Sequence, residues 1–99
     1  MPYYSVVFVT PKSDTWIPDY IAAVKPLVAK HGGKYLARTA SHERLEGSLS
    51  PAVIAILEFP SKEAATAFYK DPAYEPHLNA RLAGADNSFH TVEGKDDFA

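Results

Sequence analysis

The sequence predicts an α+β domain in which four strands form an antiparallel sheet and two helices cover one face of that sheet. Three observations lead to this fold class. The predicted elements follow the order strand, helix, strand, strand, helix, strand. Residues 16–31 carry apolar side chains at helical spacing. At least two strand segments are apolar on both of their faces, which is typical of a sheet that is covered on both sides.

The first predicted strand covers residues 3–10, YYSVVFVT, and ends before Pro11. Alternation along a strand places Tyr4, Val6 and Phe8 on one face. The other face is also mainly apolar. We therefore expect a layer of protein against each face of this strand.

The clearest predicted helix covers residues 16–31. The three residues before it, 13–15, are Ser, Asp and Thr, each of which can cap a helix. Pro26 lies inside the helix and removes one backbone donor, but the apolar stripe continues in phase beyond it. This pattern predicts a kink rather than a break. Gly32 or Gly33 is expected to supply the left-handed residue that ends the helix.

The remaining predicted elements are short strands and short helices. They are a strand over 34–40, a strand over 52–59, a helix capped by Ser61, a Pro-interrupted helix over 73–82 and a last strand over 88–93. The resulting order is that of the split β-α-β unit of ferredoxin-like folds. In the strand over 34–40, regular alternation predicts that Tyr35, Ala37 and Thr39 share one face and that Leu36 and Arg38 share the other.

A sheet that is apolar on both faces and has helices on only one needs a second cover. A second copy of the chain, packed sheet against sheet, supplies it, and we therefore expect a homodimer. An interface of standard size would hide about 800 Å² on each chain.

Length and charge limit the classes of function. The 99 residues predict one domain over 1–99. Ten basic and twelve acidic residues give a net charge of -2, which argues against a nucleic-acid partner. There is no polybasic patch, no apolar run of about 18 residues and no signal-like N-terminus, so we expect no membrane partner and a cytoplasmic location. The absence of cysteine excludes disulfides and thiolate chemistry.

No strong catalytic motif occurs in the chain. Gly32-Gly33 precedes a strand rather than a helix, so it is not a phosphate-binding loop. The four histidines, which are His31, His42, His77 and His90, lack the spacing of metal ligands. We therefore expect neither a metal nor a cofactor.

Three residues are the candidates for acid-base chemistry. His31 ends the apolar stripe of the first helix, where it is either a capping residue or a general base at the mouth of a pocket. Arg38 lies within a strand and needs a partner for its charge. Glu46 is a candidate partner, and the pair is either a structural ion pair or a site in which Glu46 orients an anion-binding Arg38.

Aromatic residues make up 12% of the chain. They form either a core rich in rings or a cavity that stacks a flat apolar ligand and orients it with tyrosyl hydroxyls. For the second interpretation, the candidate substrate-binding residues are Trp16, Tyr69, Tyr74 and Arg81. Arg81 is either a solvated surface residue or a ligand contact.

Five segments together resemble a known family. They are residues 31–38 (HGGKYLAR), 45–47 (LEG), 58–61 (EFPS), 67–69 (AFY), and 73–74 (AY) followed by Arg81. In this order they resemble the domain of unknown function family thirteen-thirty, of the dimeric α/β barrel superfamily, over about residues 3–94. The positions that match the family pattern are His31, Arg38, Glu46, Tyr74 and Arg81. Ala40-Ser41 departs from it, because relatives usually carry two glycines there.

The resemblance implies a homodimer whose two sheets face each other, but it implies no single activity. The wider superfamily includes cofactor-independent quinone-forming monooxygenases, muconolactone isomerases and haem enzymes, and no haem ligand carries over to this chain. Three hypotheses follow. The chain is a cofactor-independent enzyme acting on a small aromatic or enol-type metabolite, a non-catalytic small-molecule-binding or stress-associated module, or a structural dimer.

Overall fold

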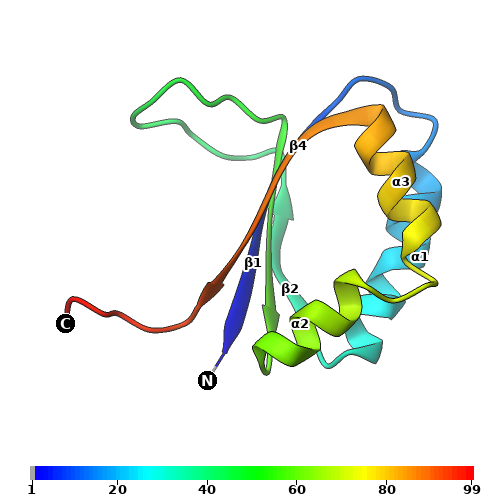
Figure 1. The fold of residues 1–99 in the computed structure, drawn as a ribbon. Helices are drawn as coiled ribbons and strands as arrows, with labels where there is room; N and C mark the ends of the chain where they lie inside the picture. Colours follow the sequence, from blue (N-terminus) through cyan, green and yellow to red (C-terminus); the bar gives the residue numbers. More distant parts are fainter. Residues whose placement is uncertain (1) are drawn as a thin grey trace.

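Seven elements succeed one another in the computed structural model, which describes residues 2–99. They are β1 (Tyr3–Pro11), α1 (Ile17–Lys30), β2 (Lys34–Thr39), β3 (Val53–Phe59), α2 (Lys62–Tyr69), α3 (Glu75–Gly84) and β4 (Ala85–Glu93). The strands form one antiparallel sheet in the order β2-β3-β1-β4. All three helices lie on the same side of it (Figure 1). The predicted ferredoxin-like fold is confirmed. No helix within residues 2–99 is long and apolar enough to cross a membrane.

The start of α1 differs from the prediction. Its N-cap is Trp16, which makes no side-chain capping hydrogen bond, so the prediction of a cap within residues 13–15 was wrong. Pro18 in the first turn lacks one of the N–H groups that a capping side chain would bind. The helix continues through Pro26 without a break, and Gly32 follows it with a φ of 77°.

Two later connections in the chain are short. The Ser61 hydroxyl caps α2 by accepting a hydrogen bond of 3.1 Å from the Ala64 amide, as predicted. Strand β4 begins at Ala85, directly after Gly84 ends α3. It therefore starts three residues earlier than predicted, because the polar residues 86 and 87 are part of the strand rather than of a connection.

Strand β2 contains an irregularity that changes which side chains share a face. Tyr35 is opposite Leu57 and Arg38 is opposite Ala55, with a register shift between Tyr35 and Ala37. Such a bulge adds one residue to β2 and interrupts the alternation. Tyr35 and Arg38 therefore lie on the same, helix-facing side, and the predicted division of this strand into two faces was wrong.

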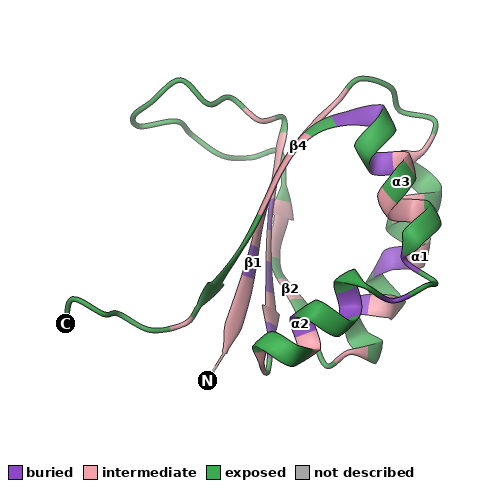
Figure 2. Ribbon diagram, viewed as in Figure 1, coloured by how far each residue is buried: buried purple, intermediate pink, exposed green. Residues whose placement is uncertain are grey.

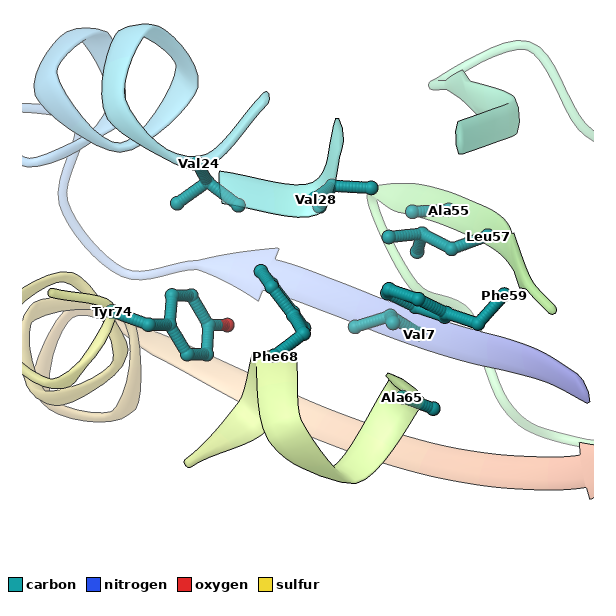
Figure 3. Close-up of a cluster of buried hydrophobic side chains, with 9 residues drawn as sticks. All are labelled: Val7, Val24, Val28, Ala55, Leu57, Phe59, Ala65, Phe68 and Tyr74. Carbon is teal, nitrogen blue, oxygen red and sulfur yellow. The ribbon is translucent and has the colours of Figure 1, made fainter. Parts of the chain in front are cut away.

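The core lies between the sheet and the helices. Its buried members, drawn in Figure 3, are Val7, Val24, Val28, Ala55, Leu57, Phe59, Ala65, Phe68 and Tyr74. The Phe68 ring centroid lies 5.6 Å from that of Phe59 and 4.6 Å from that of Tyr74, so rings join the sheet to α2 and α3. Such contacts add to the stabilisation from apolar burial.

The opposite face of the sheet has no helix against it. Buried and half-buried residues alternate within β1 and β3 (Figure 2), and the residues on this face are half-buried ones. Cross-strand pairing places Val6 opposite Ile56 and Phe8 opposite Ile54 on that side. We call this the bare face, and it comprises Tyr4, Val6, Phe8, Ile54, Ile56 and Val92. Segment 40–52 and the C-terminal tail extend on the same side (Figure 1).

Candidate functional site

A cavity of about 300 Å³ lies between the sheet and helices α1 and α3. Its walls are mainly apolar and rich in rings. The aromatic residues that line it are Trp16, Tyr20, Tyr35, Phe68, Tyr74 and Phe89. This combination of apolar walls and a few polar groups is typical of a site for a small organic molecule.

Arg81 lies in this cavity with no acidic partner for its charge among residues 2–99. The residue is only 1% exposed, and its Nε, Nη1 and Nη2 atoms have no hydrogen-bond partner among residues 2–99. Its guanidinium carbon lies 5.6 Å from the centroid of the Phe89 ring. Burial lowers the pKa of the Arg81 guanidinium, but the neighbouring Tyr74 and Tyr20 raise it by more, so Arg81 is cationic. A buried charge without a partner is costly and marks a candidate anion site.

Two tyrosine hydroxyls adjoin Arg81. The Oη atoms of Tyr20 and Tyr74 are 2.8 Å apart. Burial, together with the neighbouring Tyr74, raises the pKa of Tyr20 well above its ordinary value of 10.0, so its hydroxyl stays protonated. The pair carries two hydroxyl hydrogens and uses one of them between its own oxygens. The second hydrogen is free to be donated to a ligand.

Arg38 enters the cavity from β2 because of the bulge. Its guanidinium carbon lies 4.1 Å from the centroid of the Tyr35 ring, a cation-π contact, and its buried Nη1 has no partner in the described chain. Burial raises the pKa of Tyr35, although Arg38 acts in the opposite direction, so Tyr35 is neutral beneath the guanidinium. Arg38 is thus a second cation in the lining, which contains no Asp or Glu of the described residues.

Glu46 does not orient Arg38. It lies in the exposed segment between β2 and β3, and neither a hydrogen bond nor an ion pair joins the two side chains within residues 2–99. The predicted pairing was therefore wrong. Segment 40–52 extends away from the helices, whereas Arg38 faces them, so the short sequence separation between the two residues was misleading.

His31 lies outside the cavity lining and contacts an acid instead. Its Nε2 is 2.8 Å from Oδ2 of Asp71, which also accepts a hydrogen bond of 3.1 Å from Nζ of Lys30. The backbone amide of Ala73 donates to Oδ1 of Asp71 at 2.9 Å. The hydrogen bond with His31, followed by those from Ala73 and Lys30, holds the pKa of Asp71 far below its ordinary value of 3.8. This cluster joins the end of α1 to the turn between α2 and α3.

Trp16, Tyr74, Arg38 and Arg81 are the predicted site residues that the structure brings together around the cavity. Trp16 is held there by a hydrogen bond of 3.2 Å from Nε1 to the carbonyl oxygen of Gly84. Tyr69 is 38% exposed and lines a separate surface hollow of about 240 Å³ on the α2 side of Phe89.

The predicted site omitted Tyr20 and Tyr35. Tyr20 could have been found from its position on the apolar stripe of α1, four residues, or about one helical turn, before the buried Val24. Tyr35 could not, because its position depends on the bulge. No group of three or more His, Asp and Glu side chains suited to a metal ion occurs in the part of the chain that is described.

With this geometry established, comparison with known proteins identifies the family. Residues 2–95 match the model of a family described as "Domain of unknown function (DUF1330)". The chain belongs to this family. A search of curated proteins finds no match to the chain.

Solved structures share the fold at low sequence identity. A protein of unknown function from Rhodopseudomonas palustris has a TM-score of 0.81 at 18% identity, over 96% of this chain and 83% of its own. A dimeric ferredoxin-like protein of unknown function from Jannaschia sp. has a TM-score of 0.76 at 14% identity, over 94% and 99%. SnoaB, a cofactor-independent oxygenase from Streptomyces nogalater, has a TM-score of 0.69 at 15% identity, over 98% and 96%.

Proposed function

We propose that this chain binds a small, planar molecule with an anionic oxygen in the cavity between the sheet and α1 and α3. Arg81 carries this proposal, because it is a buried cation with no acidic partner in the described chain. An oxyanion beside it would offset its charge and accept hydrogen bonds from its nitrogen atoms. The aromatic walls would hold the apolar part of the molecule.

We further propose that the bound molecule is an enol-type or aromatic metabolite on which the protein acts without a cofactor. A preorganised guanidinium favours an enolate over its neutral form, and this is a form of electrostatic catalysis. SnoaB, which shares the fold, is a cofactor-independent oxygenase, and this supports an activity that needs no cofactor. His31 and Glu46 are not part of this proposal, because neither lines the cavity.

The alternative is binding without turnover. The lining has neither a carboxylate nor an imidazole among the described residues, so no side chain of the ordinary general-base type faces the ligand. A binding module needs only the cations and the rings. This observation keeps the non-catalytic function as a second candidate.

We propose that the working unit is a homodimer formed through the bare face. The central strands β1 and β3 leave Val6, Phe8, Ile54 and Ile56 only partly buried there in a single chain. Segment 40–52 and the tail flank that face, and they carry the strongly exposed Leu45 and Phe98. A second copy would cover these apolar side chains. The Jannaschia protein, which has the same fold, is dimeric.

Calorimetric titration with 2-naphthoate tests the binding site. We expect one site per chain and a loss of affinity of about tenfold or more in Arg81→Met, because the charge-assisted hydrogen bonds are lost. Arg44→Met is the matched control, since Arg44 is an exposed arginine that bonds only within its own loop, to Ser50 and Ser48. Failure of 2-naphthoate to bind, or equal losses in the two variants, would contradict the proposal.

Deuterium exchange separates the enzyme from the binding module. The planar ketone 2-indanone exchanges its α hydrogens through an enolate, and NMR in D₂O follows this exchange. If the cavity stabilises the enolate, exchange is faster with the wild-type protein than in buffer, and Arg81→Met abolishes the difference. Exchange at the buffer rate, with 2-naphthoate still bound, would favour the non-catalytic module.

A further inference from the structure

We propose that the cavity is a two-ended site selective for a planar molecule with two anionic groups. This inference rests on the proposed function, because it takes the cavity to be an anion site. It adds that one anion is bound at Arg81 and a second at Arg38. The ligand class is therefore a planar dianion, such as an aromatic dicarboxylate, rather than a monoanion.

Sheet register places the two arginines at opposite ends of one row. Arg38 on β2 is opposite Ala55 on β3, Ala55 is opposite Val7 on β1, and Val7 is opposite Phe89 on β4. All four residues line the cavity, and Arg81 lies over the Phe89 ring. The row therefore crosses the sheet from one edge strand to the other, over about 14 Å of strand spacing. Arg38 lies at one end of this row, and Arg81 lies by the residue at the other end.

The floor between these ends is apolar. Val7 and Ala55 are the middle residues of the row, and both are small and buried. Tyr20 and Tyr74 close the cavity on the helix side. A planar ring system that lies along the row would contact Val7 and Ala55 on one face.

Each end has its own donors. At the α3 end, Arg81 offers three unpaired nitrogen atoms, and the Tyr20–Tyr74 pair offers one hydroxyl hydrogen. At the β2 end, Arg38 offers its unpaired Nη1 while its guanidinium rests on the Tyr35 ring. A carboxylate has two acceptor oxygens, which suits a guanidinium at either end.

Charge balance favours a dianion over a monoanion. The lining holds two cations and no acid among residues 2–99. Two like charges in an apolar cavity repel each other, and a monoanion would compensate only one of them. A ligand with an anion at each end compensates both, and the second anion should strengthen binding rather than weaken it.

Calorimetry with paired probes tests this selectivity. The pairs are benzoate with terephthalate, and 2-naphthoate with naphthalene-2,6-dicarboxylate. We expect at least one dicarboxylate to bind tenfold or more tightly than its monocarboxylate parent. In Arg38→Gln this advantage should fall to within threefold, while the affinity for the parent changes less than threefold. Arg38→Lys, which keeps the charge, should retain part of the advantage, and Arg44→Gln should retain all of it.

The outcomes separate this inference from the proposed function. If the monocarboxylates bind and no dicarboxylate binds more tightly, the two-ended site is wrong and the single anion site stands. If neither class binds, both proposals fail. If the advantage persists unchanged in Arg38→Gln, with its fold verified by circular dichroism, Arg38 is not the second subsite and the inference is overturned.

Discussion

Arg81 is the residue at which stability and function are expected to conflict. Its guanidinium is buried against rings and has no acid beside it within the described chain. Desolvating a charge without a compensating partner opposes folding. A residue of this kind is explained by a ligand that completes its environment, and this is the physical basis of the proposed anion site.

Replacing Arg81 by methionine should therefore stabilise the free protein. We expect Arg81→Met to raise the free energy of unfolding by about 1–3 kcal/mol, because an apolar side chain of similar length removes the desolvation cost. Urea unfolding without ligand measures this change. The same variant should lose 2-naphthoate binding. A free energy of unfolding that falls by several kcal/mol instead would indicate a structural role for Arg81.

Asp71 should make stability depend on pH in the acid range. Its pKa is lowered in the folded chain, first by the hydrogen bond with His31, so its contribution is fully present above the ordinary value of 3.8. That contribution is lost as the pH falls towards the folded-state pKa. We expect the urea midpoint of the wild type to fall more steeply from about pH 5 to about pH 2 than that of Asp71→Asn. Asp86→Asn, at an exposed position, should behave as the wild type does.

At the scale of elements, the bulge in β2 decides the composition of the site. Regular alternation would separate Arg38 from Tyr35, and it is the register shift that stacks one on the other. Nothing in KYLART shows where the extra residue is accommodated, because a bulge is set by pairing with the neighbouring strand. Contact between α3 and α1 also shapes the cavity, because residues of both helices line it.

Gly84, the last residue of α3, packs against Trp16, the N-cap residue of α1. A Cβ atom at this position would collide with the indole of Trp16, whose Nε1 donates to the Gly84 carbonyl oxygen. We expect Gly84→Ala to lower the free energy of unfolding by about 1–3 kcal/mol through overpacking. It should also shift the fluorescence of Trp16, the only tryptophan, to longer wavelength. Ala83→Ser, at the exposed neighbouring position, should change neither quantity.

At the scale of the whole molecule, the bare face is the proposed dimer interface, because it carries apolar side chains that no helix covers. Ile56 lies on the central strand β3, opposite Val6 on β1, near the middle of this face. We expect Ile56→Lys to convert the proposed dimer into a monomer in sedimentation equilibrium, because a charge at the centre of an apolar interface is costly to bury. Leu82→Lys, a half-exposed position on α3, is the matched control and should leave the dimer intact. A monomeric wild-type protein at micromolar concentration would contradict the proposed assembly.

Local patterns in the sequence determined the elements and the fold class. The spacing of apolar residues predicted α1, and Ser61 predicted the start of α2. Strands that are apolar on both faces predicted a sheet that needs a layer of protein on each side. These signals act over a few residues, so a single chain read in order displays them. Of the candidate site, the rings of Trp16 and Tyr74 followed from aromatic content and from the family resemblance.

Only the tertiary structure decided which polar groups share a cavity. His31 contacts Asp71, which is forty residues away in the sequence. Glu46 lies in segment 40–52, which extends on the side of the sheet opposite the helices. Arg81 proved to be buried, because it lies on the face of α3 that carries Leu78 and packs towards the sheet, near the Phe89 ring. Burial and pairing depend on contacts between distant segments. Residue type and spacing do not encode these contacts directly, so the chemistry of the site emerges only when the sheet and helices are assembled.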